Sequence, residues 1–112
     1  MRVAPNHRGF PLSGRIFLMT YVRMSIAVPC AGKAGEAIQL MHEINNQIAD
    51  TTGCINTFVI QPQDEIGEII RVAVFRDYDS HESERYVKSI DSFSNEMDRC
   101  LAKDHEEKAF FS

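Results

Sequence analysis

The sequence predicts an α+β fold in which one antiparallel sheet is covered on one face by two helices. From Tyr21 to Phe111 the patterns follow the order strand, helix, strand, strand, helix, strand. In the first strand pattern apolar residues fall at alternate positions, and in the first helix pattern they recur every three or four positions. Two strand–helix–strand units in this order place both helices on the same face and leave the other face uncovered.

The first two elements have clear limits. A strand is predicted over Tyr21–Val28, because its apolar residues alternate and Pro29 cannot continue the ladder. A helix is predicted over Lys33–Ala49, where one apolar stripe precedes the stop signal Thr51-Thr-Gly53. The strand's alternating residues are Val22, Met24, Ile26 and Val28, and the helix stripe comprises Ala34, Ile38, Met41, Ile44 and Ile48.

Three more strands and a second helical region complete the pattern. The strands are predicted at Ile55–Gln61, Glu68–Phe75 and Glu106–Phe111. The turn-rich residues 62–67 form a hairpin loop between the first two of these. Asp79, with an acid three residues later, predicts the N-cap of a helical region that runs to about Lys103 and breaks near 89–92. Together these elements make a ferredoxin-like two-layer sandwich of βαββαβ order.

Length and charge limit the possible functions. The 112 residues form one domain, predicted over 19–112, preceded by a flexible leader at 1–18, and Met19 is an alternative translation start. Beyond residue 20 the chain has nine basic against sixteen acidic residues, which argues against nucleic acid as a partner. Its three cysteines have no metal or disulfide spacing, and it lacks a membrane-length apolar run, so we expect a cytoplasmic protein without membrane contact.

Short motifs at the turns resemble those of the antibiotic-biosynthesis-monooxygenase-type domains of the dimeric α/β-barrel superfamily, over roughly residues 21–111. They are Pro29, Gly32 and Lys33 after the first strand, Gly53 and Cys54 after the first helix, and Tyr86-Val-Lys-Ser89 in the second helical region. The resemblance implies a homodimer whose open sheet faces pack together as a barrel. It also implies an activity among cofactor-free oxygenases of quinol-like compounds, haem-degrading oxygenases and members with no established reaction.

The chain departs from the family's functional pattern at three places. Phe75 stands where a tryptophan commonly ends the third strand, and the sequence contains no tryptophan. Tyr86 aligns with a position where histidine is frequent. Arg23 and Ser25 occupy the region in which haem-degrading members use an asparagine. Haem degradation is therefore the less favoured alternative.

Tyr86 and Arg71 are the predicted catalytic residues, with Arg23 as a substrate-binding residue. The Tyr86 phenol can hydrogen-bond or deprotonate a phenolic substrate, or it is an amphipathic residue at the pocket or dimer rim. Arg23 and Arg71 share a strand phase and can hold a carboxylate or an enolate oxygen. Alternatively they pair with acids across the dimer interface, such as Glu68 or Asp77.

Apolar residues complete the predicted binding site for a small hydrophobic or aromatic ligand. The predicted substrate-binding residues, besides Arg23, are Phe58, Phe75, Phe93 and Met97. A wider set is expected to reach the space between sheet and helices, and adds Met24, Met41, Phe110 and Phe111. The four scattered histidines predict no metal site, and no cofactor motif is present. His42 is expected on the helix surface and Cys54 as an inert thiol.

These observations predict a small cofactor-independent monooxygenase that acts on an aromatic or quinol-type compound. The first alternative is a non-catalytic dimer that binds a small hydrophobic metabolite. The second is an isomerase or decarboxylase, which requires a base in the pocket, and Asp77 and His81 are the candidates for it. Fold alone does not separate these activities.

Overall fold

The computed structural model of the protein describes residues 19–63, 67–81 and 93–112. Its elements are β1 (Tyr21–Ala27), α2 (Ala34–Ala49), β2 (Cys54–Ile60), β3 (Ile69–Phe75), α3 (Tyr78–His81) and β4 (Glu106–Phe111). Residues 93–98 form a further helical segment. The predicted leader 1–18 and Tyr86 lie outside the described residues.

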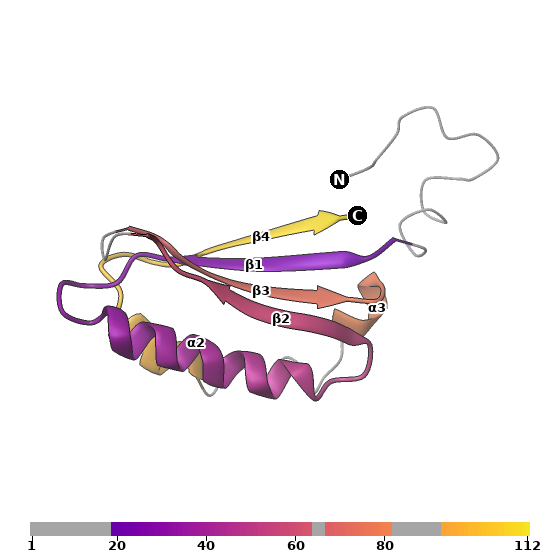
Figure 1. Cartoon of the computed structure of the whole chain (residues 1–112), viewed down its shortest axis with the longest axis horizontal. Coiled ribbons are helices and arrows are strands. Elements are labelled where there is room, and N and C mark those ends of the chain that lie inside the picture. The colour runs from indigo at the N-terminus through magenta and orange to yellow at the C-terminus, as the bar shows by residue number, and fades with distance from the viewer. Residues whose placement is uncertain (1–18, 64–66, 82–92) are drawn as a thin grey trace, which may run out of the picture.

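The four strands form one antiparallel sheet in the order β2-β3-β1-β4. Figure 1 shows α2 and helical residues 93–98 on the same side of this sheet. The other side of the sheet, hereafter the open face, has no helix of the described residues over it. The predicted α+β, ferredoxin-like two-layer fold is therefore confirmed.

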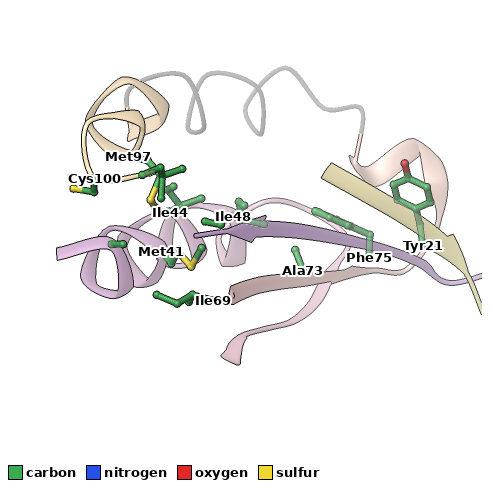
Figure 2. Packing of buried hydrophobic residues seen from close by; sticks show 12 residues of the cluster. Tyr21, Met41, Ile44, Ile48, Ile69, Ala73, Phe75, Met97 and Cys100 are labelled. Atoms are coloured by element: carbon green, nitrogen blue, oxygen red, sulfur yellow. The ribbon is translucent and has the colours of Figure 1, made fainter. Parts of the chain in front are cut away.

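The hydrophobic core fills the space between the helices and the side of the sheet that they cover, hereafter the helix-facing side. Met41, Ile44 and Ile48 of α2 pack there against Ile69 and Phe75 of β3 (Figure 2). Burying a side chain of this size contributes about 1.5–3 kcal/mol. The packing of α2 against β3 thus holds this helix on the sheet.

A strand of alternating residues is expected to bury its apolar set, but β1 buries the other set. Tyr21, Ser25 and Ala27 are the buried residues of β1. Met24 lies on the open face, because it pairs with Val72 of β3 in the register that places Ser25 opposite Arg71 on the helix-facing side. The more polar half of β1 is therefore the half that the helices cover.

The helix boundaries lie close to the predicted ones. The α2 helix ends at Ala49, where the Thr51 hydroxyl donates to the Ile48 carbonyl at 2.6 Å and Gly53 adopts a φ of +89°. The predicted N-cap at Asp79 is wrong, because α3 begins at Tyr78 and Asp77 caps it, accepting from the Ser80 amide at 2.9 Å. Among the described residues, no helix combines the length and hydropathy needed to cross a membrane.

Candidate active site

A row of polar residues crosses three strands on the helix-facing side of the sheet. Arg71 of β3, Ser25 of β1 and Glu107 of β4 occupy directly paired positions. Arg71 is only 4 % exposed and Ser25 is also buried. Antiparallel pairing brings such residues within side-chain contact across the strands. The row therefore places two opposite charges and a hydroxyl beneath the helical layer.

Hydrogen bonds join the row into one network. Arg71 Nη2 donates to Ser25 Oγ at 2.7 Å, and Ser25 Oγ in turn donates to Glu107 Oε2. Arg23, two positions before Ser25 on β1, donates from Nη2 to Glu107 Oε1 at 2.7 Å. Both carboxylate oxygens of Glu107 are thus engaged by donors from the neighbouring strand.

The network fixes the ionisation of Glu107. Desolvation raises the pKa of this carboxyl, but the hydrogen bonds from Ser25 and Arg23 and the charges of Arg71 and Arg23 outweigh it. The pKa of Glu107 therefore lies below its ordinary value. Glu107 is a carboxylate at neutral pH and acts there as a hydrogen-bond acceptor.

His105 lies between two carboxylates at the edge of this network. Its Nε2 is 3.2 Å from Glu107 Oε2, and its Nδ1 is 3.7 Å from Asp98 Oδ1. The side chain of His105 is one-third exposed, which leaves a route for protons to reach solvent. A histidine held by a carboxylate and open to water is suited to accept and release a proton.

The polar row borders a small cavity of about 30 Å³ between sheet and helices. The polar residues on its wall are Ser25, Arg71, Ser94, His105 and Glu107, and the apolar ones are Ala27, Met41, Ile44 and Met97. A cavity of this size holds about one or two water molecules, or dioxygen. A larger ligand requires the helical layer to move away from the sheet.

Metal binding finds no support among the described residues. No group of three or more His, Cys, Asp and Glu side chains in 19–63, 67–81 and 93–112 is arranged to hold a metal ion. At His105 the reason is geometric, because Asp98 and Glu107 approach opposite nitrogens of the ring and cannot share one ion with it.

The structure brings three of the predicted site residues together. Arg71 and Met97 line the cavity, and Arg23 contacts Glu107, which also lines it. Within the chain, Arg23 forms an ion pair with Glu107, and the charge of Arg71 also acts on Glu107; the pairing of these arginines with Glu68 or Asp77 across a dimer stays a prediction. Asp77 instead caps α3, and hydrogen bonds from Ser80 lower its pKa.

The predicted aromatic residues are scattered. Phe75 is buried in the core and Phe93 packs against that core, but neither lines the cavity. Phe58 lies on the open face, because it pairs with Val72, so the expectation that it reaches the space under the helices is wrong. Met24 and Phe110 share this outcome, whereas Met41 and Phe111 lie on the helix-facing side. His42 is exposed, as expected.

Three residues of this site, Ser25, His105 and Glu107, were not predicted from the sequence. A signal for Glu107 was present, because it alternates with Ala109 and the core-packed Phe111 on the last strand. An acid in phase with an aromatic residue that packs against the core lies on the core-facing side of the sheet. His105 had no such signal, because it precedes β4 and its position depends on the connection from helical residues 93–98.

Comparison with known proteins identifies the fold. No protein-family model matches the chain, and no curated protein is similar to it in sequence. Solved structures match it over most of its length. One is a mutant of SnoaB, a cofactor-independent oxygenase from Streptomyces nogalater, with a TM-score of 0.68 and 11 % identity over 83 % of this chain and 92 % of that one.

Two further structures share another description. A putative antibiotic biosynthesis monooxygenase from Caulobacter crescentus matches with a TM-score of 0.66 and 12 % identity, covering 88 % of this chain and 93 % of that one. Another, from Nitrosomonas europaea, has a TM-score of 0.63 and 12 % identity, covering 83 % and 89 %. This chain has the antibiotic-biosynthesis-monooxygenase fold. The architecture thus agrees with the resemblance seen in the turn motifs. At this level of identity the fold does not define the reaction, which has to be inferred from the residues of the site.

Proposed function

We propose that this protein is a cofactor-independent monooxygenase that binds an aromatic or quinol-type compound between its sheet and its helices. The observation that carries the proposal is the hydrogen-bonded Arg71–Ser25–Glu107 row, in which Arg71 and Ser25 are buried, on the wall of a cavity that apolar side chains of α2 and Met97 also line. Buried charge is costly and is concentrated where a protein handles charged or ionising ligands. The description of SnoaB as a cofactor-independent oxygenase supports the same chemistry.

In this mechanism His105 removes a proton from the substrate and Glu107 holds the resulting imidazolium. The substrate anion then gives one electron to dioxygen, and the radical pair combines to form a carbon-bound peroxide. Loss of water from that peroxide leaves a carbonyl, so that a methylene group and dioxygen become a carbonyl group and water. The guanidinium of Arg71 stabilises negative charge on the substrate oxygen. Tyr86 remains proposed as a hydrogen-bond partner of the phenol.

The small cavity imposes a condition on binding. A ring-sized substrate occupies several times about 30 Å³, so the helical layer moves when the substrate enters. Met41 and Met97 form the opposing apolar wall, and their flexible side chains suit such a change. Ligand binding is therefore expected to alter the packing of helical residues 93–98 more than that of the sheet.

Oxygen uptake with a panel of reduced naphthoquinol and anthrone-like compounds tests the proposal. Arg71→Ala and His105→Asn are expected to lower kcat by about 100-fold or more, as removal of a catalytic donor or base does. Arg76→Ala and His42→Asn are the matched controls, because both residues are exposed and outside the cavity. Equal turnover in the site variants and the controls would refute the assignment, and tight binding without uptake would indicate a non-catalytic binding protein.

An isomerase or decarboxylase is the second candidate, and one observation favours it. That activity needs a base in the pocket, and His105 with Glu107 supplies one, which Asp77 does not. Conversion of substrate under strictly anaerobic conditions, without oxygen consumption in air, would identify this activity and exclude the monooxygenase.

We also propose that two copies of the chain pair through the open face. Its apolar residues, in register across the four strands, are Val22, Met24, Ile26, Phe58, Ile60, Ile70, Val74 and Phe110, with Val72 already buried among them. At the β4 edge the same face carries Glu106 and Lys108, one acid and one base, which favours association with an identical copy. An apolar surface of this extent is typical of an interface. The free thiols of the described cysteines fit the expected cytoplasmic location.

A further inference from the structure

Cys30 and Cys100 lie opposite each other where the chain leaves β1. An isolated antiparallel bridge pairs Pro29 with Leu101. On one side of it the Cys30 amide donates to the Cys100 carbonyl at 2.7 Å, and on the other the Ala102 amide donates to the Val28 carbonyl at 2.8 Å. The two cysteines therefore face each other with one of the two bonds of a hydrogen-bonded antiparallel pair, since the Cys100 amide donates to the Met97 carbonyl. Cα atoms in such a pair are about 5.5 Å apart. A disulfide requires about 4.4–6.8 Å.

The two thiols differ in access to solvent. Cys100 is 4 % exposed, whereas Cys30 is partly exposed. Figure 2 shows Cys100 at the edge of the hydrophobic cluster, with its sulfur directed away from the labelled apolar side chains. An oxidant in solution therefore reaches Cys30 first, and Cys100 is the protected partner behind it.

A carboxylate contacts the buried thiol. Cys100 Sγ donates to Glu36 Oε2 at 3.4 Å. Burial raises the pKa of Cys100, the neighbouring Glu36 and Cys30 raise it further, and Lys33 opposes them. The influence of Cys30 on this pKa is consistent with two sulfur atoms that lie near each other. Glu36 is placed to accept the Cys100 proton when that thiol reacts.

We propose that Cys30 and Cys100 are a redox-active pair that forms an intramolecular disulfide when the protein meets a peroxide. This site is separate from the proposed active site and does not depend on the proposed function. Its two cysteines come from the segment after β1 and from the turn after helical residues 93–98, and its carboxylate base, Glu36, comes from α2. The cysteine at the helix–sheet interface, Cys54, takes no part in it.

The reaction proceeds in two balanced steps. Cys30 attacks hydrogen peroxide, the O–O bond breaks, and Cys30 sulfenic acid and one water form. Cys100 then attacks the sulfenic sulfur, its proton passes to Glu36 and onward to the departing hydroxide, and a second water leaves as the S–S bond forms. Two thiols lose two electrons and two protons, and one peroxide is reduced to two waters. A dithiol such as dithiothreitol reverses the reaction by disulfide exchange.

The disulfide would connect the chain just after β1 to the chain just after helical residues 93–98. It would close a loop that contains α2, β2 and β3, and long closed loops gain the most from cross-linking. Met97, on the cavity wall, lies three residues before Cys100, so the bond would restrain the helical layer against the sheet. The oxidised protein is expected to melt at a higher temperature than the reduced protein.

Peptide mapping of the full chain tests the proposal directly. The protein is treated with hydrogen peroxide, its remaining thiols are alkylated under denaturing conditions, and the products are identified by mass spectrometry. The expected product is a monomer with a Cys30–Cys100 link, one alkylated thiol at Cys54, and reversal by dithiothreitol. A link to Cys54, links only between chains, or oxidation of Cys30 without any link would each overturn the proposal. This measurement uses the unaltered chain, so it does not depend on whether a variant folds.

Variants then test the roles of the individual groups. Cys54→Ser is expected to form the same link as the unaltered protein, and Cys30→Ser and Cys100→Ser to form none. Glu36→Gln is expected to slow disulfide formation about 10-fold or more and to prolong the sulfenic acid, which dimedone traps, because the proton acceptor is lost. Glu43→Gln is the matched control, because Glu43 lines the same groove as Glu36 and Cys100. Equal rates in the two glutamine variants would remove Glu36 from the mechanism.

Discussion

Each face of the sheet carries some residues that the environment of the other face would favour. On the helix-facing side, Arg71 and Ser25 are buried beneath α2 and helical residues 93–98. On the open face, Phe58 is 42 % exposed and Phe110 is 40 % exposed. The folding of one isolated chain explains neither choice, because burial favours apolar residues and exposure favours polar ones.

The difference between the two faces suggests that each has its own function beyond the folding of the sheet. A network that buries an arginine such as Arg71 costs several kcal/mol of desolvation and adds little net stability, so its presence points to a ligand or a reaction. Exposed aromatic and aliphatic residues in one register point to a surface that is covered by another chain. The residues of the helix-facing side should therefore control activity, and those of the open face should control association.

The largest expected effect is the loss of the proposed dimer when charge is introduced into the open face. Phe58→Lys would bury two ammonium groups in the proposed interface, and the dissociation constant should rise about 1,000-fold, or about 4 kcal/mol. Sedimentation equilibrium over a range of concentrations measures this change. Gln47→Lys adds the same charge on the exposed side of α2 and should leave association unchanged. A parent protein that is monomeric at every concentration would refute the proposal that the open face is a dimer interface.

The next effect concerns the buried network. Glu107→Gln keeps an acceptor but removes the charge that Arg23 and Arg71 face, so the free energy of unfolding at pH 7 should fall by about 2 kcal/mol. This figure is below the full cost of breaking a buried pair, because the Glu107 side chain is one-third exposed. Urea unfolding measures it. Glu106→Gln, on the adjacent exposed residue, should change the stability by less than about 0.5 kcal/mol.

The pH dependence of stability, compared between the parent protein and Glu107→Gln, gives an independent check on the role of this carboxylate. Because the pKa of Glu107 is lower in the folded than in the unfolded chain, its stabilisation is complete above the unfolded pKa. It is lost as the pH falls through the folded pKa. The difference in stability between the parent and Glu107→Gln should therefore be constant near neutral pH and shrink under acid conditions. A difference that grows on acidification would contradict the role of the carboxylate.

A smaller effect of opposite sign is expected at Asn45, a buried polar residue outside the network. Its side chain is 3 % exposed and, within the described residues, its amide makes no hydrogen bond. Asn45→Leu should raise the free energy of unfolding by about 1–2 kcal/mol, because a buried unsatisfied amide is costly. Asn46→Leu makes the same change at an exposed position of α2 and isolates the small gain in helix propensity. A destabilised Asn45→Leu would indicate that this amide has a partner in the folded protein.

The element order was predictable from the sequence because it depends on local patterns. Alternation in β1 and the apolar stripe of α2 identify their elements, and Pro29 and Gly53 mark ends that the structure confirms within a few residues. The N-cap at Asp77 was missed, because Asp79 offers the same side chain two positions later. Local chemistry does not decide between two acids that are both able to cap a helix.

The site was less predictable because it depends on register. The alternation in β1 indicates two faces but not which face the helices cover, and the apolar half containing Met24 is on the open face. The pairing of Ser25 with Arg71 and Glu107 joins residues 46 and 82 positions apart, and no local pattern encodes it. The arginines were identified by type, but their partner Glu107 became visible only once β4 was paired with β1.

The smallest effect tests whether the polar row acts as one unit. Ser25→Ala removes the hydroxyl that accepts from Arg71 and donates to Glu107, and should lower the free energy of unfolding by about 1 kcal/mol. If the serine couples the two charges, its loss should matter less once Glu107 is already Gln. A double-mutant cycle with Glu107→Gln should then give a coupling energy of about 0.5–1 kcal/mol. The cycle of Ser25→Ala with Asn46→Leu should be additive, because Asn46 is exposed on α2. Additivity in both cycles would mean that the buried charges and the hydroxyl are independent, and the contrast between the two faces would then rest on the open face alone.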